Sequence, residues 1–152
     1  NERPDVSVMG EIIPSKEYYD YEAKYTPGLV DIVIPAASLP EEVVRQAQEI
    51  ALRAFTSLDC AGMARVDFFL DRPTGRLYLN EINTIPGFTS TSVYPRLWEA
   101  SGLPYPQLLD RLILLALERH RTKAGLRTFY DPTADDIRAV TQVTSTSKMY
   151  KP

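Results

Sequence analysis

The turn at residues 71–76, "DRPTGR", constrains the fold of this chain most strongly, because strand-like segments flank it on both sides. Pro73 has the fixed φ of a type I turn, and Gly75 can adopt the left-handed conformation that closes a three-residue connection. The sequence therefore predicts a β-hairpin centred on Thr74.

This register would bring polar side chains together on one face of the hairpin. It places Asp67 opposite Glu81 and Arg65 opposite Asn83, and strand alternation adds Phe69 to the face of Arg65 and Asp67. Two facing carboxylates repel each other, so the pattern favours a divalent cation between them. Mg²⁺ suits these oxygen ligands and completes its coordination with water and phosphate oxygens.

Two other interpretations of the same residues stay open. The side chains also fit the solvent-facing side of a half-exposed sheet, on which Arg65 pairs with Asp67 or Glu81. A calcium site without catalysis would use the same oxygen atoms. The following loop, "NTIPGFTSTS" at 83–92, favours a site for metal and phosphate, because backbone N–H groups and hydroxyls can bind an oxyanion or a carboxylate.

Composition excludes several other kinds of site and partner. The net charge of −3 gives no reason to expect nucleic acid, and no apolar run approaches the roughly 20 residues that span a membrane. The single histidine, His120, excludes a histidine-rich zinc site. The single cysteine, Cys60, excludes an internal disulfide and is typical of a reducing compartment.

Hydrophobic patterns outside the hairpin predict further strands and helices. Strands are expected at 6–13 and 29–35, and helices at 39–58, 93–101 and 107–120, with a short helix near 134–140. Ser38 is the expected N-cap of the first helix. The last full helix should bury a leucine-rich face made by Leu108, Leu109, Leu112, Leu115 and Ala116.

Together these elements indicate one domain with an α+β fold, in which helices flank a largely antiparallel sheet. The domain is expected at 1–120. Residues 121–152 form a polar tail that we expect to be mobile, because "TQVTSTSK" is close to low complexity.

At this point the residues resemble a known family. "ARVDFFLD" and "GRLYLNEINTIPGFTSTSVYP" closely resemble the metal-binding hairpin and the following loop of D-alanine–D-alanine ligases, which are ATP-grasp enzymes. "YDYEAKY", residues 19–25, resembles their mobile loop, and "GEIIP" falls in the expected order. The resemblance covers about residues 1–120 and corresponds to the ATP-grasp C-terminal half. Because the chain starts at Asn1, we expect a fragment or a processed product that lacks the N-terminal portion of the ligase.

The resemblance implies a metal centre and an oxyanion site. Asp67, Glu81 and Asn83 correspond to the ligands of two Mg²⁺ or Mn²⁺ ions, with Glu81 bridging both. Arg65 corresponds to the arginine that stabilises the acyl phosphate and the tetrahedral intermediate. The N–H of Gly87 corresponds to an oxyanion-hole donor.

The resemblance also implies binding sites for the second substrate and the phosphates. Ser92, with the N–H of Val93, corresponds to the group that holds the carboxylate of the second substrate. Lys24 and Tyr25 correspond to the loop pair that closes over the phosphates and the second subsite. Closure would exclude the water that otherwise hydrolyses an acyl phosphate.

The implied reaction is ATP-dependent synthesis of D-alanyl-D-alanine for peptidoglycan, in the bacterial cytoplasm. Phe69 and Asn80 are implied to contact ATP. The expected partners are D-alanine, ATP, the missing N-terminal portion and a second copy of the parent enzyme in a homodimer, without nucleic acid or membrane. The isolated chain is expected to be inactive or nearly so.

Several alternatives accompany the resemblance. A variant ligase would make D-alanyl-D-lactate or D-alanyl-D-serine, although Tyr25 favours an amine acceptor by analogy. A non-catalytic module that binds Mg-nucleotide or a divalent metal would keep the hairpin but would not need Gly87 or Ser92. Simple structural roles also fit: Ser92 as a helix N-cap, Gly87 as a turn residue, and Phe69 as a core residue.

Overall fold

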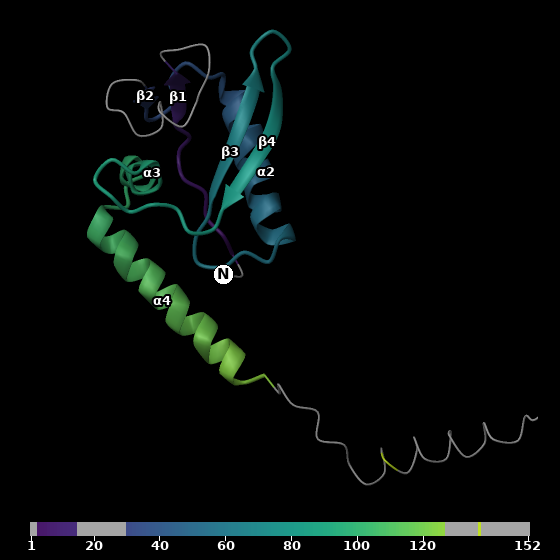
Figure 1. The fold of residues 1–152 in the computed structure, drawn as a ribbon, viewed down its shortest axis with the longest axis vertical. Helices are drawn as coiled ribbons and strands as arrows, with labels where there is room; N and C mark the ends of the chain where they lie inside the picture. Colours follow the sequence, from purple (N-terminus) through teal and green to yellow (C-terminus); the bar gives the residue numbers. More distant parts are fainter. Residues whose placement is uncertain (1–2, 15–29, 127–136, 138–152) are drawn as a thin grey trace, which may run out of the picture. The chain divides into compact units, whose positions relative to one another are not determined.

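The computed structural model describes residues 3–14, 30–126 and 137, and Figure 1 shows the fold. The chain divides into two units, residues 1–120 and 121–152. Lys24, Tyr25 and the helix expected near 134–140, apart from Ile137, lie outside the described residues. The described elements, in chain order, are β1 (Glu11–Pro14), β2 (Val30–Val33), α2 (Glu41–Ser57), β3 (Arg65–Asp71), β4 (Arg76–Asn83), α3 (Val93–Ala100) and α4 (Tyr105–Ala124).

The strands form antiparallel pairs, which confirms the predicted α+β class. β1 pairs with β2, and β3 pairs with β4. Among the described residues these pairs are two separate two-stranded sheets. α2 lies beside the β3–β4 hairpin in Figure 1 and contacts β4.

The strand predicted at 6–13 begins later than expected, because the backbone before β1 is bound by helices. The N–H of Val8 donates to Oγ of Ser101 at 2.8 Å. The carbonyl oxygen of Ser7 accepts a hydrogen bond from the Gln48 side chain at 2.9 Å. These side chains, on α2 and directly after α3, replace the partner strand that a ladder would need.

α2 confirms the predicted amphipathic helix, but its start differs. The N-cap is Pro40, and no side chain caps the helix there. Ser38 was the expected cap, yet its hydroxyl donates to the carboxylate of Glu11 on β1. Ala47 is 1% exposed and forms the buried centre of the helix.

α3 and α4 follow the hairpin and its loop. α3 ends before Gly102, whose φ of +89° lies in the left-handed region that terminates helices. α4 begins at Tyr105 and is longer than predicted. Its predicted apolar face is only partly buried: Leu108 is 2% exposed, whereas Leu109 is 38% exposed. Leu112 and Leu115 are half-buried and Ala116 is exposed.

The hydrophobic interior of the described residues is small. Its buried apolar side chains are Ala36, Ala47, Tyr94 and Leu108, together with the prolines Pro86 and Pro95. Large apolar side chains remain exposed on the hairpin and on α4. No described helix combines the length and the apolar character that crossing a bilayer demands.

Candidate functional site

The connection between β3 and β4 is longer than the sequence predicted. It contains four residues, 72–75, because Asp71 pairs with Arg76. The prediction of a three-residue connection centred on Thr74 is therefore wrong. Gly75 does adopt the expected left-handed conformation, with φ +70°. Its N–H donates to the carbonyl oxygen of Asp71 at 2.8 Å, and this bond closes the wider turn.

The longer connection shifts the strand register by one residue from the predicted one, and a β-bulge in β4 cancels this shift. Phe68 pairs with Leu79, whereas Asp67 pairs with Glu81, so Asn80 is the inserted residue. The predicted Asp67–Glu81 pair is therefore confirmed, although the turn that predicted it is wrong. A bulge also twists the strand locally, at the position of the candidate metal ligands.

Arg65 makes the central contacts of this polar face. It pairs with Asn83, as predicted. Its Nε and Nη2 atoms donate to the two carboxylate oxygens of Asp67, each at 2.8 Å. Nη2 also lies 3.5 Å from Oε1 of Glu81. The guanidinium thus neutralises two facing carboxylates in this state, as the solvent-facing interpretation expects.

The oxygen atoms around Arg65 also fit a hard divalent cation. Asp67 and Glu81 offer carboxylates from facing positions, and Asn83 adds a neutral amide oxygen. Oδ1 of Asn83 accepts a hydrogen bond from the N–H of Ile85 at 3.0 Å. This bond fixes the direction of the amide and leaves a second lone pair for a metal. Within the part of the chain that the structure describes, no cluster of three or more His, Cys, Asp or Glu side chains forms a metal site.

An exposed aromatic pair continues the hairpin face beyond the carboxylates. Phe69 pairs with Tyr78, because the bulge shifts β4 by one residue; the predicted register would have placed Leu79 there. Phe69 is 63% exposed, so within the described residues it is not part of the hydrophobic core. The guanidinium of Arg76 lies 5.3 Å from the centre of the Tyr78 ring.

The loop after β4 holds Ser92 in an unexpected way. Ser92 occupies the N-cap position of α3 but makes no capping hydrogen bond with its side chain, so the N-cap interpretation is wrong for its hydroxyl. Its Oγ instead accepts the N–H of Thr89 at 2.9 Å and lies 2.8 Å from Oγ1 of Thr89. The N–H of Val93 sits in the first turn of α3, where the helix dipole favours an anion.

Gly87 lies against the Ser92 side chain. A Cβ atom added to Gly87 would be 2.9 Å from Oγ of Ser92, closer than real Cβ contacts come. Glycine is therefore needed here for a close approach, in addition to any role in the turn. The loop thus brings Gly87 and the Ser92 side chain together.

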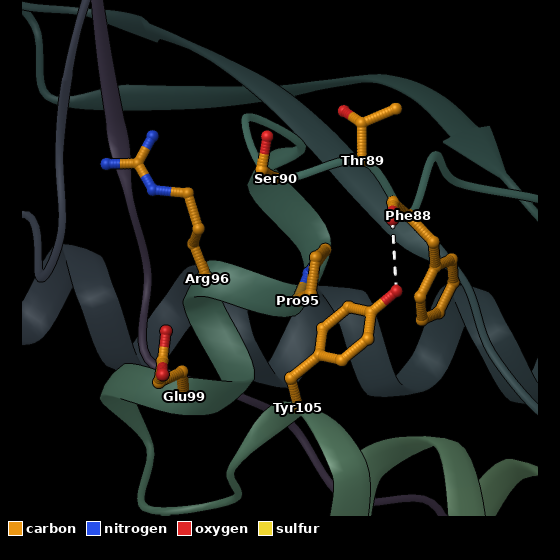
Figure 2. A pocket seen from close by; sticks show the side chains of 7 residues that line it. All are labelled: Phe88, Thr89, Ser90, Pro95, Arg96, Glu99 and Tyr105. Atoms are coloured by element: carbon orange, nitrogen blue, oxygen red, sulfur yellow. Dashed lines mark hydrogen bonds between the residues drawn. The ribbon is translucent and has the colours of Figure 1, made fainter.

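A group of aromatic residues supports this loop from α3 and α4. The Phe88 ring lies 5.6 Å from that of Tyr94 and 6.2 Å from that of Tyr105. The hydroxyl of Tyr105 donates to the carbonyl oxygen of Phe88 at 3.0 Å (Figure 2). Figure 2 also shows the neighbouring pocket of about 360 Å³, which is lined by Phe88, Thr89, Ser90, Pro95, Arg96, Glu99 and Tyr105.

Sequence reasoning did not identify Tyr105 or Tyr78. Tyr78 faces Phe69 only because of the bulge, and no local sequence pattern in β4 predicts that bulge. Tyr105 contacts a residue 17 positions earlier, so only the tertiary structure brings the two together. The implied loop pair, Lys24 and Tyr25, lies outside the described residues.

Solved structures with a similar fold include D-alanine–D-alanine ligases and a D-Ala:D-Ser ligase. The VanG D-Ala:D-Ser ligase from Enterococcus faecalis is 41% identical, with a TM-score of 0.61 over 72% of this chain and 31% of that one. The D-alanine–D-alanine ligase from Bacillus anthracis, complexed with ATP, is 33% identical, with a TM-score of 0.61 over 78% of this chain and 38% of that one. The chain therefore has the C-terminal fold of an ATP-grasp ligase.

Sequence comparison defines the family more narrowly. The family model "D-ala D-ala ligase C-terminus" matches residues 1–114. The D-alanine–D-alanine ligase of Thermoanaerobacter sp. (strain X514) is 54% identical over 123 residues, which are 81% of this chain and 34% of that protein. The chain belongs to the D-alanine–D-alanine ligase family, and it spans about a third of the length of the curated relatives it matches.

Proposed function

We propose that this chain is the C-terminal catalytic part of an enzyme that joins two D-alanine molecules and converts ATP to ADP and phosphate. The observation that carries the proposal is the polar face of the hairpin. There Arg65, Asp67, Glu81 and Asn83 converge, directly before the loop that holds Gly87 against Ser92. A protein that only bound a metal would not need this loop.

The carboxylates of Asp67 and Glu81 and the amide oxygen of Asn83 would hold two Mg²⁺ or Mn²⁺ ions. When bound, the ions would neutralise negative charge on the phosphate oxygens of ATP. Arg65 now contacts both carboxylates, so a bound cation would free part of its guanidinium to contact a phosphoryl group. The donor set supports this assignment, since hard cations prefer such oxygens.

The proposed chemistry has two steps. The carboxylate of the first D-alanine attacks the γ-phosphorus of ATP, which gives an acyl phosphate and ADP, because a free carboxylate has no adequate leaving group. The amine of the second D-alanine then attacks the acyl carbon and phosphate leaves. The N–H of Gly87 would stabilise the oxyanion of this second step, and Arg65 would stabilise the phosphoryl oxygens.

We assign the carboxylate of the second substrate to Ser92 and Val93. The Ser92 hydroxyl does not cap α3, and the N–H of Val93 lies at the positive end of the helix. A small carboxylate would therefore meet one hydroxyl and one backbone N–H. Both groups suit the carboxylate of a D-amino acid.

The nucleotide would lie along the exposed side of the hairpin. Phe69 is 63% exposed beside the metal ligands and can contact a purine. Asn80, exposed at the bulge, is the second proposed contact. Lys24 and Tyr25 would close over the phosphates, an assignment that rests on the sequence resemblance alone.

The exposed apolar side chains of the hairpin support the need for further protein. Phe69, Tyr78 and Leu79 are 63%, 45% and 43% exposed, a pattern typical of surfaces that a ligand or partner covers. We propose that the portion of the relatives outside the match covers them. The complete enzyme is proposed to be a homodimer in the bacterial cytoplasm, where ATP is available.

A chimera tests the proposed function. This chain replaces the matching segment of the Thermoanaerobacter relative, and ADP release is measured with D-alanine, Mg²⁺ and ATP. Asp67→Asn and Glu81→Gln should each lower the rate at least about a hundredfold, because each removes a metal ligand charge. Asp71→Asn is the matched control, since it makes the same change on β3 away from the cluster. A chimera that binds Mg-ATP but releases no ADP with D-alanine would refute the ligase, and equal rates for the Asp67 and Asp71 variants would refute the metal site.

D-serine is the second candidate acceptor. The similarity to the VanG D-Ala:D-Ser ligase, at 41% identity, favours testing it. The same chimera is assayed with D-alanine as donor and with D-serine or D-lactate in excess, and the products are separated. Predominant D-alanyl-D-serine would replace the D-alanine assignment of the second subsite without changing the metal site.

A further inference from the structure

The peptide unit that joins Phe88 to Thr89 is hydrogen-bonded at both edges. Its carbonyl oxygen accepts the Tyr105 hydroxyl at 3.0 Å, as Figure 2 shows. Its N–H donates to Oγ of Ser92 at 2.9 Å. Because a peptide unit is planar, two bonds on opposite edges fix its orientation. Rotation of this plane would turn the N–H of Thr89 away from Ser92.

Tyr105 holds the side chain of Phe88 as well as its backbone. The two rings are 6.2 Å apart in an edge-on arrangement, and Tyr94, 6% exposed, supports the Phe88 ring from α3. Thr89 and Ser90 are exposed, so packing against the interior contributes little to their position. The orientation of residues 88–90 therefore depends strongly on the contact with Tyr105.

The Ser92 hydroxyl connects this segment to the proposed acceptor subsite. Its oxygen accepts the N–H of Thr89 with one lone pair, which leaves its proton available for a carboxylate. Oγ1 of Thr89, 2.8 Å away, can then donate to the second lone pair. The direction in which Ser92 donates is thus set by Thr89, and the position of Thr89 is set by the peptide plane.

We propose that Tyr105 is a positioning residue for the second substrate: through the Phe88–Thr89 peptide it aims the Ser92 hydroxyl at the acceptor carboxylate. The inference rests on the proposed function, because it assigns a role within the same site. Tyr105 touches no reacting atom. Its effect is therefore expected on the Michaelis constant for the acceptor, with little effect on the chemical steps.

The neighbouring pocket allows a positioning role of Tyr105 to be distinguished from a purely structural one. The pocket, of about 360 Å³, is lined by Tyr105, Phe88 and Thr89 and can admit water. If the Tyr105 hydroxyl is removed, water can still donate to the carbonyl of Phe88, so no buried acceptor is left unsatisfied. A mobile water molecule would not fix the peptide plane. Stability should therefore change little, whereas acceptor binding should weaken.

The kinetic test uses Tyr105→Phe in the complete chimera, with Tyr94→Phe as the matched control. Both variants lose one hydroxyl from the same aromatic group, but only Tyr105 bonds the loop backbone. Tyr105→Phe should raise the KM of the second D-alanine about three- to tenfold, the effect of one hydrogen bond. The KM for ATP and kcat should stay within about twofold. Tyr94→Phe should leave all constants within about twofold.

A second measurement reports the hydrogen bonds of the Phe88–Thr89 peptide without requiring turnover. Hydrogen exchange of the Thr89 amide, measured in the chimera by NMR, should be at least about threefold faster in Tyr105→Phe than in Tyr94→Phe. If the parent chimera is active and the KM for the second D-alanine is the same in Tyr105→Phe and Tyr94→Phe, the positioning role alone is refuted. A parallel change in kcat and in every KM of Tyr105→Phe also refutes it. A parent chimera that makes no dipeptide refutes the proposed function, and the role of Tyr105 with it.

Discussion

Replacing Gly87 by alanine tests the contact that shapes the loop. The new Cβ would lie 2.9 Å from Oγ of Ser92, where an ordinary contact exceeds about 3.4 Å. The Ser92 side chain must therefore rotate away. Rotation breaks its bonds to the N–H and to Oγ1 of Thr89.

The expected magnitude follows from these two bonds. Each neutral hydrogen bond contributes about 0.5–1.5 kcal/mol, and values at the low end apply because Thr89 is exposed. The loss is therefore about 1–2 kcal/mol. Gly87→Ala also restricts the unfolded chain, which offsets about 0.5 kcal/mol. We expect a net loss of about 1 kcal/mol in the free energy of unfolding.

A double-mutant cycle isolates the contact. In a Ser92→Ala background there is no Oγ to displace, so Gly87→Ala should be neutral or stabilising by about 0.5 kcal/mol. The coupling energy between the two sites should be about 1–1.5 kcal/mol. Gly125→Ala is the matched control for the effect on the unfolded chain, since its Cβ would make only ordinary contacts at 3.6 and 3.9 Å.

The single tryptophan of the chain provides the assay. Trp98 lies 6.4 Å from Tyr94, which packs against Phe88 in the loop. Its fluorescence should therefore report urea unfolding of this region. A coupling energy within about 0.3 kcal/mol of zero would show that Gly87 and Ser92 are not in contact, and would refute the close-approach argument for the glycine.

Three further predictions concern packing, ionisation and metal affinity. Gly10→Ala should destabilise the chain by about 1–3 kcal/mol in the same urea assay, because its Cβ would lie 3.0 Å from atoms of Ile34 and Leu97; a loss no larger than that of Gly125→Ala would contradict it. Burial raises the pKa of Tyr94 above its ordinary value of 10.0, so the stability it contributes is complete below pH 10 and is lost as pH rises through the folded pKa. An absorbance titration of the chain minus that of Tyr94→Phe should show this late ionisation, and a midpoint at or below 10 would refute it. Arg65→Met should strengthen Mn²⁺ binding roughly tenfold by calorimetry, because the guanidinium no longer opposes the cation; unchanged or weaker binding would place the metal elsewhere.

Strand alternation fixes which side chains of one strand share a face, so the sequence could place Arg65 on the face of Asp67, and Glu81 on the face of Asn83. Arg65 and Asn83 do face each other, as do Asp67 and Glu81. The turn length could not be predicted in the same way, since Pro73 and Gly75 fit both a three-residue and a four-residue connection. The correct pairs resulted from two offsets that cancel, one in the turn and one at Asn80.

The roles of the hydroxyl groups also lay beyond local patterns. Ser38 and Ser92 both stand where an N-cap is expected, yet Ser38 bonds Glu11 and Ser92 bonds Thr89. A hydroxyl takes whichever partner the fold brings within reach, and competing partners differ by only about 1 kcal/mol. Local preference is too weak to decide between them.

By itself, the sequence determined the polar face of the hairpin, the α+β class and the amphipathic α2, because these depend on periodicity along a short segment. The tertiary structure alone decided the bulge that sets Phe69 against Tyr78, and the hydroxyl that reaches from Tyr105 to Phe88. The bulge depends on how β4 pairs with β3, and the Tyr105 hydroxyl reaches a residue 17 positions away. The free energy of such contacts is shared between residues that no short window of sequence contains.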